Sequence, residues 1–162
     1  ENQLSRYGME IERTELDIDE IQSDSQEEIS LDKARKAYKI LEEPVLVMDS
    51  GLFIKELNGF PGPYTSYVED TLGVDGLLEL IDRASEAYIM QTVSYTDSQV
   101  EKVFSSKKRG EIVDEKQGEG YFFDPVFVHR EKGKTLAEME LEERIEAWGD
   151  CWDRFCNWYM ER

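Results

Sequence analysis

Residues 46–67 read LVMDSGLFIKELNGFPGPYTSY, and this stretch contains the strongest structural signals in the chain. It continues a short apolar run, 45–47, which predicts a buried strand. The run ends at a carboxylate, Asp49, followed by Ser50 and Gly51. Ligands in open α/β sheets bind beyond the carboxyl ends of strands. We therefore expect Asp49 at a strand tip, in a place suited to a metal ion and a phosphate chain.

The second half of the stretch contains two glycines and two prolines at 59–63, which fix a turn of unusual backbone geometry. A short helix is expected directly afterwards, at 65–72, with Ser66 in its first turn. Bare backbone at Gly62 beside a helix N-terminus can form a concavity that binds an anion. A tight turn without any ligand explains the same residues equally well.

The composition indicates one folded domain. The chain has 162 residues, of which 40% are hydrophobic and 11% aromatic, enough for one core and too few for two comfortable domains. We find no internal repeat or low-complexity linker, so a single domain over 1–162 is expected. No apolar run reaches the length of a membrane span, and we recognise no secretory signal.

The charge and the reactive side chains restrict the partners. With 37 acids against 19 bases the net charge is −18, which excludes free nucleic acid as an expected partner because a phosphate backbone needs a basic footprint. Cys151 and Cys156 fall on different faces of an expected helix, which argues against a mutual disulfide and favours a reducing cytoplasm. His129 is the only histidine and is expected in a loop without a partner, so no zinc site is predicted.

Hydrophobic periodicity and turn residues predict alternating helices and strands. The first residue is Glu1, so we expect that the chain is either processed or lacks its true beginning. Residues 1–7 are expected to end a helix at Gly8. The expected strands are 9–16, 45–47, 87–95, 100–104, 111–113 and 126–128, with turns at 96–98 and 107–110. The expected helices are 26–41, 65–72, one capped by Asp75, one begun by the capping box Thr135–Glu138, and 141–159.

Two carboxylates and a lysine form the first candidate site. Glu20 follows the first expected strand and Asp49 the central one, so the two acids meet if these strands are neighbours. Paired carboxylates suit Mg²⁺, which shares its remaining positions with water and substrate phosphates. Lys33, on the helix at 26–41, can neutralise a triphosphate. The alternatives are two surface acids and an exposed lysine paired with Glu28 or Asp32.

The aromatic run before Asp124 forms the second candidate site. Phe123 beside a fixed carboxylate can stack on a purine while Asp124 accepts hydrogen bonds from its edge, although core packing is the commoner role of such aromatics. The three tryptophans of the last expected helix have the same two interpretations, an interaction surface or, preferably, core packing; they are Trp148, Trp152 and Trp158.

These motifs, in this order, resemble the inosine triphosphate pyrophosphatase family, whose members hydrolyse non-standard purine nucleoside triphosphates. The segment 59–67 looks most like archaeal members. The matching segments are Glu20-Ile21-Gln22-Ser23-Asp24, Lys33-Ala34, Asp49-Ser50-Gly51-Leu52, residues 57–64 with Ser66, Phe123-Asp124-Pro125-Val126-Phe127 and residues 133–139.

The resemblance implies an α/β fold with a mixed central sheet, flanking helices, two lobes around a cleft, and a homodimer. It implies Mg²⁺-dependent attack of water on the α-phosphate, which releases a nucleoside monophosphate and pyrophosphate. By position, Glu20 and Asp49 would hold Mg²⁺ or orient the water, and Lys33 would neutralise the triphosphate. The implied substrate-binding residues are Ser50, Gly51, Gly62 and Ser66 for phosphates, and Phe123, Asp124 and Arg144 for the base.

The sequence also departs from the family pattern. The family carries a Ser/Thr-x-Asn-x-x-Lys phosphate motif in its first strand and loop, and this sequence starts just after that place, so the resemblance implies that the N-terminal strand is missing. Met48 stands where members carry a second carboxylate, and Phe122 replaces the glycine between the two base-stacking aromatics. Arg144 replaces a lysine, and the Ser-His-Arg that follows it in the family is absent from 145–150. Three interpretations stay open: an active pyrophosphatase, a degenerate homologue that binds a nucleotide or a protein, and an engineered or fragmentary chain.

Overall fold

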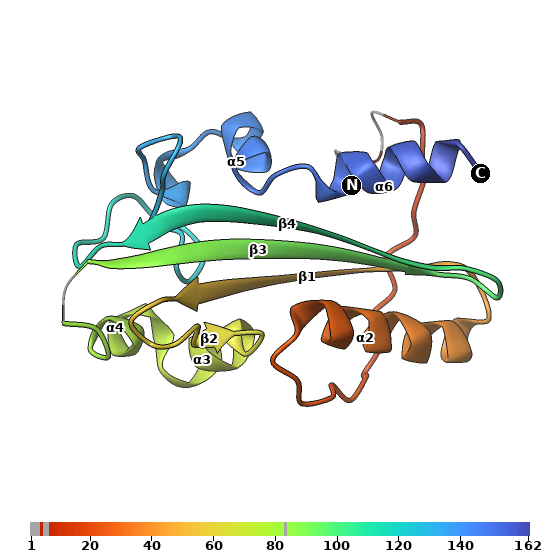
Figure 1. Cartoon of the computed structure of the whole chain (residues 1–162), viewed down its shortest axis with the longest axis horizontal. Helices are drawn as coiled ribbons and strands as arrows, with labels where there is room; N and C mark the ends of the chain where they lie inside the picture. The colour runs from red at the N-terminus through yellow and green to blue at the C-terminus, as the bar shows by residue number, and fades with distance from the viewer. Residues whose placement is uncertain (1–3, 5–6, 83) are drawn as a thin grey trace. The chain divides into compact units, whose positions relative to one another are not determined.

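The computed structural model describes residues 4, 7–82 and 84–162, and Figure 1 shows its helices and strands. A five-stranded sheet, in the order β2-β1-β3-β4-β5, carries helices on both faces. The β1–β2 and β4–β5 pairs are antiparallel. The elements are α2 (Gln26–Leu41), β1 (Val45–Ile54), β2 (Pro61–Gly62), α3 (Thr65–Thr71), α4 (Gly73–Leu78), β3 (Ser85–Thr96), β4 (Glu101–Ile112), β5 (Phe127–His129), the 3₁₀ helix η1 (Leu136–Glu138), α5 (Leu141–Ala147) and α6 (Cys151–Met160).

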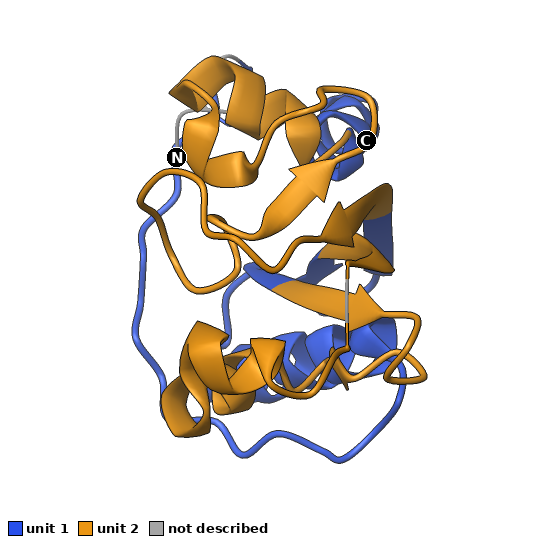
Figure 2. Cartoon of the chain, turned by 90° about the vertical axis from the view of Figure 1, so that its left-hand side faces the viewer, with its two compact units in different colours: residues 1–49, 92–105, 150–162 blue, residues 50–91, 106–149 orange. Residues whose placement is uncertain are grey.

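The chain divides into two compact units, coloured in Figure 2. Unit 1 comprises 1–49, 92–105 and 150–162, and unit 2 comprises 50–91 and 106–149. The strands β1, β3 and β4 each contribute residues to both units. Among the described residues, no helix has the length and apolar character that a membrane crossing requires.

Unit 1 has its own apolar core. The helices α2 and α6 lie on opposite faces of its strand segments (Figure 1). On the α6 face, Val93 and Tyr95 of β3 pack with buried side chains of α6. The members of this core are Leu4, Val93, Tyr95, Cys151, Phe155 and Cys156. Both cysteines are buried as free thiols, and Trp152 and Trp158 pack partly against this core.

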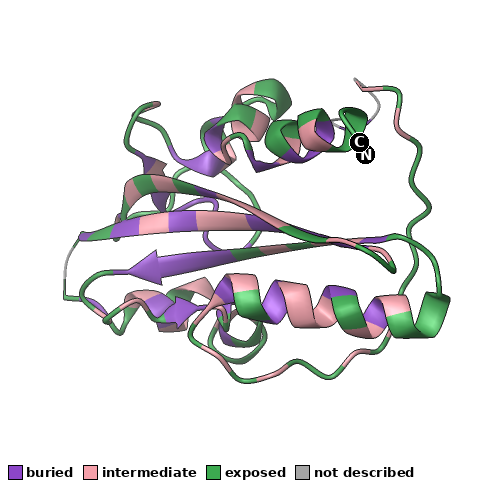
Figure 3. Cartoon of the chain, turned by 45° about the vertical axis from the view of Figure 1, so that its right-hand side comes forward, coloured by how far each residue is buried: buried purple, intermediate pink, exposed green. Residues whose placement is uncertain are grey.

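Unit 2 has a larger core, which gathers the second half of β1, the first half of β3 and the segment from 122 to 147. Leu52, Ile89 and Ile112 are almost fully buried strand residues of this core. Figure 3 shows the contrast between such buried strand positions and the exposed outer faces of the helices. Trp148 packs against this core, so all three tryptophans pack against a core, as preferred from the sequence.

Several expected elements are confirmed, with their local causes. The helix α2 spans 26–41, and the hydroxyl of Ser25 caps it by accepting a hydrogen bond from the Glu28 N–H at 3.2 Å. The capping box is present, because the Thr135 N–H donates to the Glu138 carboxylate at 2.9 Å, although the helix it begins is a single 3₁₀ turn. Asp75 does not cap α4 but lies inside its first turn.

The central strand is longer than expected. β1 does not stop at Asp49; it continues to Ile54, so Asp49 lies in mid-strand rather than at a strand tip. The break predicted at Ser50-Gly51 was wrong. A glycine can lie within a strand when the backbone on both sides of it is hydrogen-bonded to a neighbouring strand. Similarly, the basic residues 107–110 are not a turn but the middle of β4, which unites two expected strands.

The helix expected at 141–159 is two helices. α5 ends at Ala147, and α6 begins at Cys151. Between them Gly149 has φ of +94°, a left-handed conformation that a glycine adopts without strain. The turn therefore places Trp148 outside both helices.

No strand forms at 9–16, contrary to the expectation. In unit 1 a cavity of about 1050 Å³ is bordered by this segment and by the edge of β1 at 45–47. The extended residues therefore lack a neighbouring strand to supply backbone hydrogen bonds. Of the helix end expected at 1–7, only Leu4 and Tyr7 lie inside the described residues, and Gly8 has a positive φ of +68°.

Candidate functional site

In unit 1, Lys33 lies between two carboxylates, and we call Glu20, Lys33 and Asp49 the acid–lysine trio. The Lys33 ammonium donates to Asp49 Oδ1 at 2.7 Å and contacts Glu20 Oε1 at 2.6 Å. The side chains of Lys33 and Asp49 are each 19% exposed, whereas that of Glu20 is 52% exposed. The predicted meeting of the two acids is thus observed, and the alternative pairing of Lys33 with Glu28 or Asp32 is not.

Local structure explains how the trio is assembled. Lys33 lies on α2, whose buried residues Ile29, Ala34 and Ala37 fix the helix to the sheet. Burial would lower the pKa of Lys33, but the hydrogen bonds to Asp49 and Glu20 outweigh it and raise that pKa. The ammonium therefore stays charged at any physiological pH, as a group that neutralises phosphate must.

The two acids of the trio offer carboxylate oxygens that could hold a hard divalent cation. Asp49 Oδ2 is buried and has no hydrogen-bond partner among the described residues, so it is a carboxylate oxygen still available to a ligand. No group of three or more acid, histidine or cysteine side chains that could hold a metal occurs in the part of the chain that the structure describes. Two protein carboxylates completed by water and phosphate oxygens is a coordination typical of Mg²⁺.

The predicted phosphate residues all lie in unit 2. Ser50 and Ser66 are exposed, and Gly51 is buried in β1. Gly62 has φ of +58°, and a Cβ there would lie 3.0 Å from the Gly59 carbonyl oxygen and 3.2 Å from the Phe53 ring. The Gly62 carbonyl accepts a hydrogen bond from the Thr65 hydroxyl at 2.7 Å. Gly62 therefore has a structural role, whatever ligand the loop binds.

The second constellation, also in unit 2, is the Asp124–Arg144 pair. Asp124 Oδ2 lies 3.4 Å from Arg144 Nη1, and the acid side chain is 9% exposed against 41% for the arginine. Burial raises the pKa of Asp124, opposed by the Arg144 charge and by a hydrogen bond from the Tyr121 N–H. Gly120 makes room for this loop, since a Cβ there would lie 2.8 Å from Asp124 Cβ.

The aromatics around Asp124 differ in their access to solvent. Phe123 is 3% exposed and is packed among Phe122, Phe127 and Trp148, with ring centroids 5.7 to 6.4 Å away. Tyr121, by contrast, is 60% exposed. Its hydroxyl is hydrogen-bonded to Glu69 of α3, which raises the pKa of Tyr121 to about 12.

Sequence reasoning placed Tyr121 in the aromatic motif but chose Phe123 rather than Tyr121 as the residue that stacks on the base. Its position between Gly120 and the Phe122-Phe123 pair was the available signal. Phe122 itself has φ of +36°, a left-handed conformation that is strained for a bulky side chain. Strained backbone of this kind concentrates at functional sites, so the loop from Gly120 to Asp124 gains weight as a binding element.

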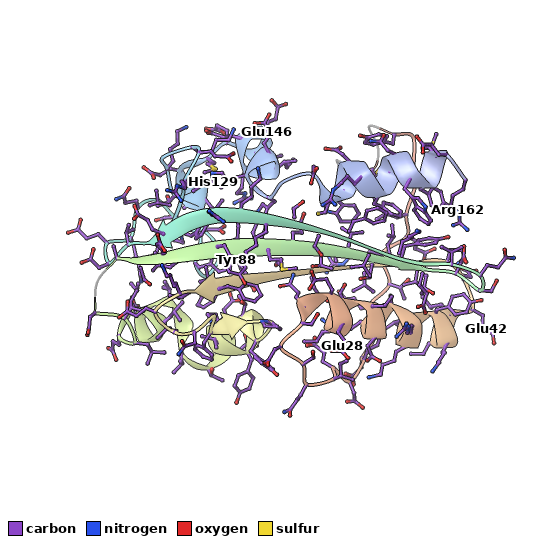
Figure 4. All side chains as sticks on the ribbon, viewed as in Figure 1. Glu28, Glu42, Tyr88, His129, Glu146 and Arg162 are labelled. Carbon is purple, nitrogen blue, oxygen red and sulfur yellow. The ribbon has the colours of Figure 1, made fainter. Side chains whose placement is uncertain are left out.

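His129 is not the unpartnered loop residue that was expected. It ends β5, on the side of the sheet that carries α5 (Figure 4), and is 1% exposed. Its Nδ1 accepts hydrogen bonds from the N–H groups of Glu131 and Lys132 at 3.2 and 3.3 Å. Burial lowers the pKa of His129, although Glu131 and the Ala147 backbone oppose the change. Its role is therefore to order the turn after β5.

The structure therefore has a helix-flanked α/β sheet and, in unit 1, a lysine held between two carboxylates. The sequence profile of the Ham1 family matches residues 2–157, and the chain belongs to that family. The fold class and the family resemblance expected from the motifs are thereby confirmed.

Named relatives agree with this assignment. The chain is 43% identical over 162 residues to the dITP/XTP pyrophosphatase of Methanopyrus kandleri, and the alignment covers 96% of this chain and 86% of the relative. It is 41% identical over 141 residues to the dITP/XTP pyrophosphatase of Saccharolobus solfataricus, covering 85% and 73%. The Staphylococcus aureus Ham1 protein is a structural neighbour with a TM-score of 0.75, 28% identity and coverage of 90% and 81%. The HAM1 protein of Coxiella burnetii shares the fold, with a TM-score of 0.79 at 24% identity and coverage of 98% and 84%.

Proposed function

We propose that this protein is a Mg²⁺-dependent nucleoside-triphosphate pyrophosphatase that hydrolyses non-standard purine nucleoside triphosphates to the monophosphate and pyrophosphate. The observation that carries the proposal is the acid–lysine trio, with an ammonium held by two carboxylates and one buried carboxylate oxygen that has no hydrogen-bond partner in the described part of the chain. The names of the relatives, dITP/XTP pyrophosphatase, supply the substrate class.

In this proposal Glu20 and Asp49 would hold the magnesium ion, which would supply charge neutralisation at the phosphates and would polarise a water. Lys33 binds a phosphate oxygen and keeps its proton throughout, because its pKa is raised. Phosphoryl transfer asks little covalent chemistry of a protein, so fixed geometry and charge are the whole contribution of these side chains. Ser50, Gly51, Gly62 and Ser66 stay predicted phosphate contacts.

The base is bound by Asp124 and Arg144 in unit 2. A buried carboxylate and a half-exposed guanidinium offer an acceptor and a donor, which together can read the edge of a base. The exposed ring of Tyr121 is better placed than the buried ring of Phe123 to stack on that base. Discrimination between bases then depends on hydrogen bonds rather than on shape alone.

One observation weighs against the alternative of a catalytically impaired, nucleotide- or protein-binding homologue. Successive residues of a strand point to opposite faces, so the Met48 side chain, which is 49% exposed, points away from the face on which Asp49 contacts Lys33. The lost carboxylate at position 48 therefore leaves the trio intact. A homodimer and a cytoplasmic location remain predictions.

The test is release of pyrophosphate with Mg²⁺ from dITP, ITP, XTP, dUTP and the four standard ribonucleoside triphosphates. We expect turnover of dITP, ITP and XTP well above that of ATP, and none after chelation of the metal. Absence of release from every substrate, with Asp49→Asn indistinguishable from the unmodified protein, would establish the alternative instead.

A further inference from the structure

A buried polar network in unit 1 surrounds the backbone of Asp49. Gln26, the first residue of α2, is 3% exposed. Its Nε2 donates to the Asp49 carbonyl oxygen at 3.1 Å and to the Thr92 hydroxyl oxygen at 3.2 Å. The Thr92 hydroxyl is hydrogen-bonded in turn to that of Ser105 at 3.1 Å. One amide thus links α2 to β1 and, through β3, to β4.

The helix α2 therefore contacts Asp49 twice. Gln26 holds the backbone carbonyl of Asp49, and Lys33, seven residues and about two turns further along α2, holds its carboxylate. A buried amide costs free energy unless its hydrogen bonds are made, and an apolar side chain would fill the same volume without that cost. The amide at this position therefore serves the geometry of β1 at Asp49 more than it serves packing.

We propose that Gln26 is a positioning residue, which fixes the direction of the Asp49 carboxylate and so tunes its affinity for the divalent cation. The proposal rests on the proposed function, in which Asp49 binds that cation. Gln26 itself touches neither metal nor substrate; it acts through the backbone of Asp49. Outer partners that orient a metal ligand typically change metal affinity or activity by about 10- to 100-fold when they are removed.

The chain offers a matched control in Ser30. Ser30 is also buried on α2, one turn after Gln26, and its hydroxyl accepts a hydrogen bond from the Ser94 hydroxyl of β3 at 2.8 Å. Replacement of Ser30 by alanine removes a buried polar link between the same helix and the same strand without touching Asp49. A merely structural role for Gln26 predicts that both variants lose stability and nothing else.

The experiment compares the unmodified protein with Gln26→Met and Ser30→Ala. It measures the Mn²⁺ dissociation constant by electron paramagnetic resonance, kcat and KM for dITP, and the urea midpoint. We expect Gln26→Met to raise the Mn²⁺ dissociation constant and lower kcat, each about 10-fold, with KM nearly unchanged. Ser30→Ala is expected to alter only the urea midpoint. If Gln26→Met does not fold, Gln26→Leu takes its place.

The outcomes are distinguishable. If Gln26→Met matches Ser30→Ala in Mn²⁺ affinity and kcat, the positioning role is wrong while the proposed function stands. If the unmodified protein hydrolyses no triphosphate, the proposed function is wrong, and the Mn²⁺ comparison alone then decides the role of Gln26. A 10-fold weaker Mn²⁺ affinity in Gln26→Met supports it, and an unchanged affinity overturns it.

Discussion

The acid–lysine trio of unit 1 and the Asp124–Arg144 pair of unit 2 use the same kinds of charge in opposite ways. In the trio, the cation is partly buried and contacts two acids at 2.6 and 2.7 Å. In the pair, the acid is buried, the cation is half-exposed, and their closest contact is 3.4 Å. In the trio, the hydrogen bonds to Asp49 and Glu20 raise the pKa of Lys33. The pair is looser, and burial raises the pKa of its acid.

This difference suggests a division of labour. Fixed charge is what catalysis by electrostatic stabilisation requires, because the groups need not rearrange during the reaction. In the Asp124–Arg144 pair, the longer contact leaves hydrogen-bonding atoms of both side chains available to a ligand. We therefore expect changes in the trio to lower kcat and changes in the pair to raise KM.

The largest effect is expected from Asp49→Asn. The amide keeps the shape of the side chain but removes the charge that binds the metal and holds Lys33, so kcat should fall about 10²- to 10³-fold. Steady-state release of pyrophosphate measures this. Asp32→Asn is the control, since Asp32 also lies on the α2 side of unit 1 but pairs with Lys36 at 2.8 Å. Equal losses in both variants would show that Asp49 has no special role.

A smaller effect, on stability, is expected in the loop of unit 2. Gly62→Ala combines a positive φ with contacts of 3.0 and 3.2 Å, whereas Gly73→Ala has the strain alone, at φ of +64° with nothing within 4 Å. Left-handed backbone costs an alanine about 1–2 kcal/mol, so Gly73→Ala should lose that amount and Gly62→Ala clearly more. Urea unfolding measures both. Equal losses of unfolding free energy in the two variants would mean that the close contacts around Gly62 relax without cost.

The smallest effect concerns pH. Burial lowers the pKa of His129 in the folded state, while an unfolded histidine has a pKa of about 6.5. Below about pH 6.5 His129 is therefore protonated more in the unfolded chain than in the folded chain, so the unfolding free energy falls as the pH falls. The difference in unfolding free energy between the unmodified protein and His129→Gln, followed from pH 7.5 to 5, should decrease. A difference independent of pH would contradict the assignment of a buried neutral imidazole.

Local signals predicted the parts of the fold that depend on neighbouring residues. Ser25 began α2 where expected because N-capping is a contact between residues three apart. The prediction that β1 ends at Asp49 failed. The length of this strand is set by its pairing with β3, which is distant in sequence. The segment 9–16 failed for the same reason, because alternation alone cannot supply a partner strand.

The candidate site divides in a similar way. Glu20, Lys33 and Asp49 were brought together from the motif order, and the structure places them in contact. Gln26 was missed, because a sequence does not show that a glutamine is buried against the backbone of Asp49. Tyr121 was passed over in favour of Phe123, because a sequence does not show which ring is exposed.

The most direct test of the division between trio and pair is a comparison of Lys33→Met with Arg144→Met on the same substrate, dITP. Both changes replace a long cationic side chain with an uncharged one. We predict that Lys33→Met lowers kcat strongly with little change in KM, and that Arg144→Met raises KM with kcat nearly unchanged. The reverse pattern, or an equal fall of kcat in both variants, would contradict the account.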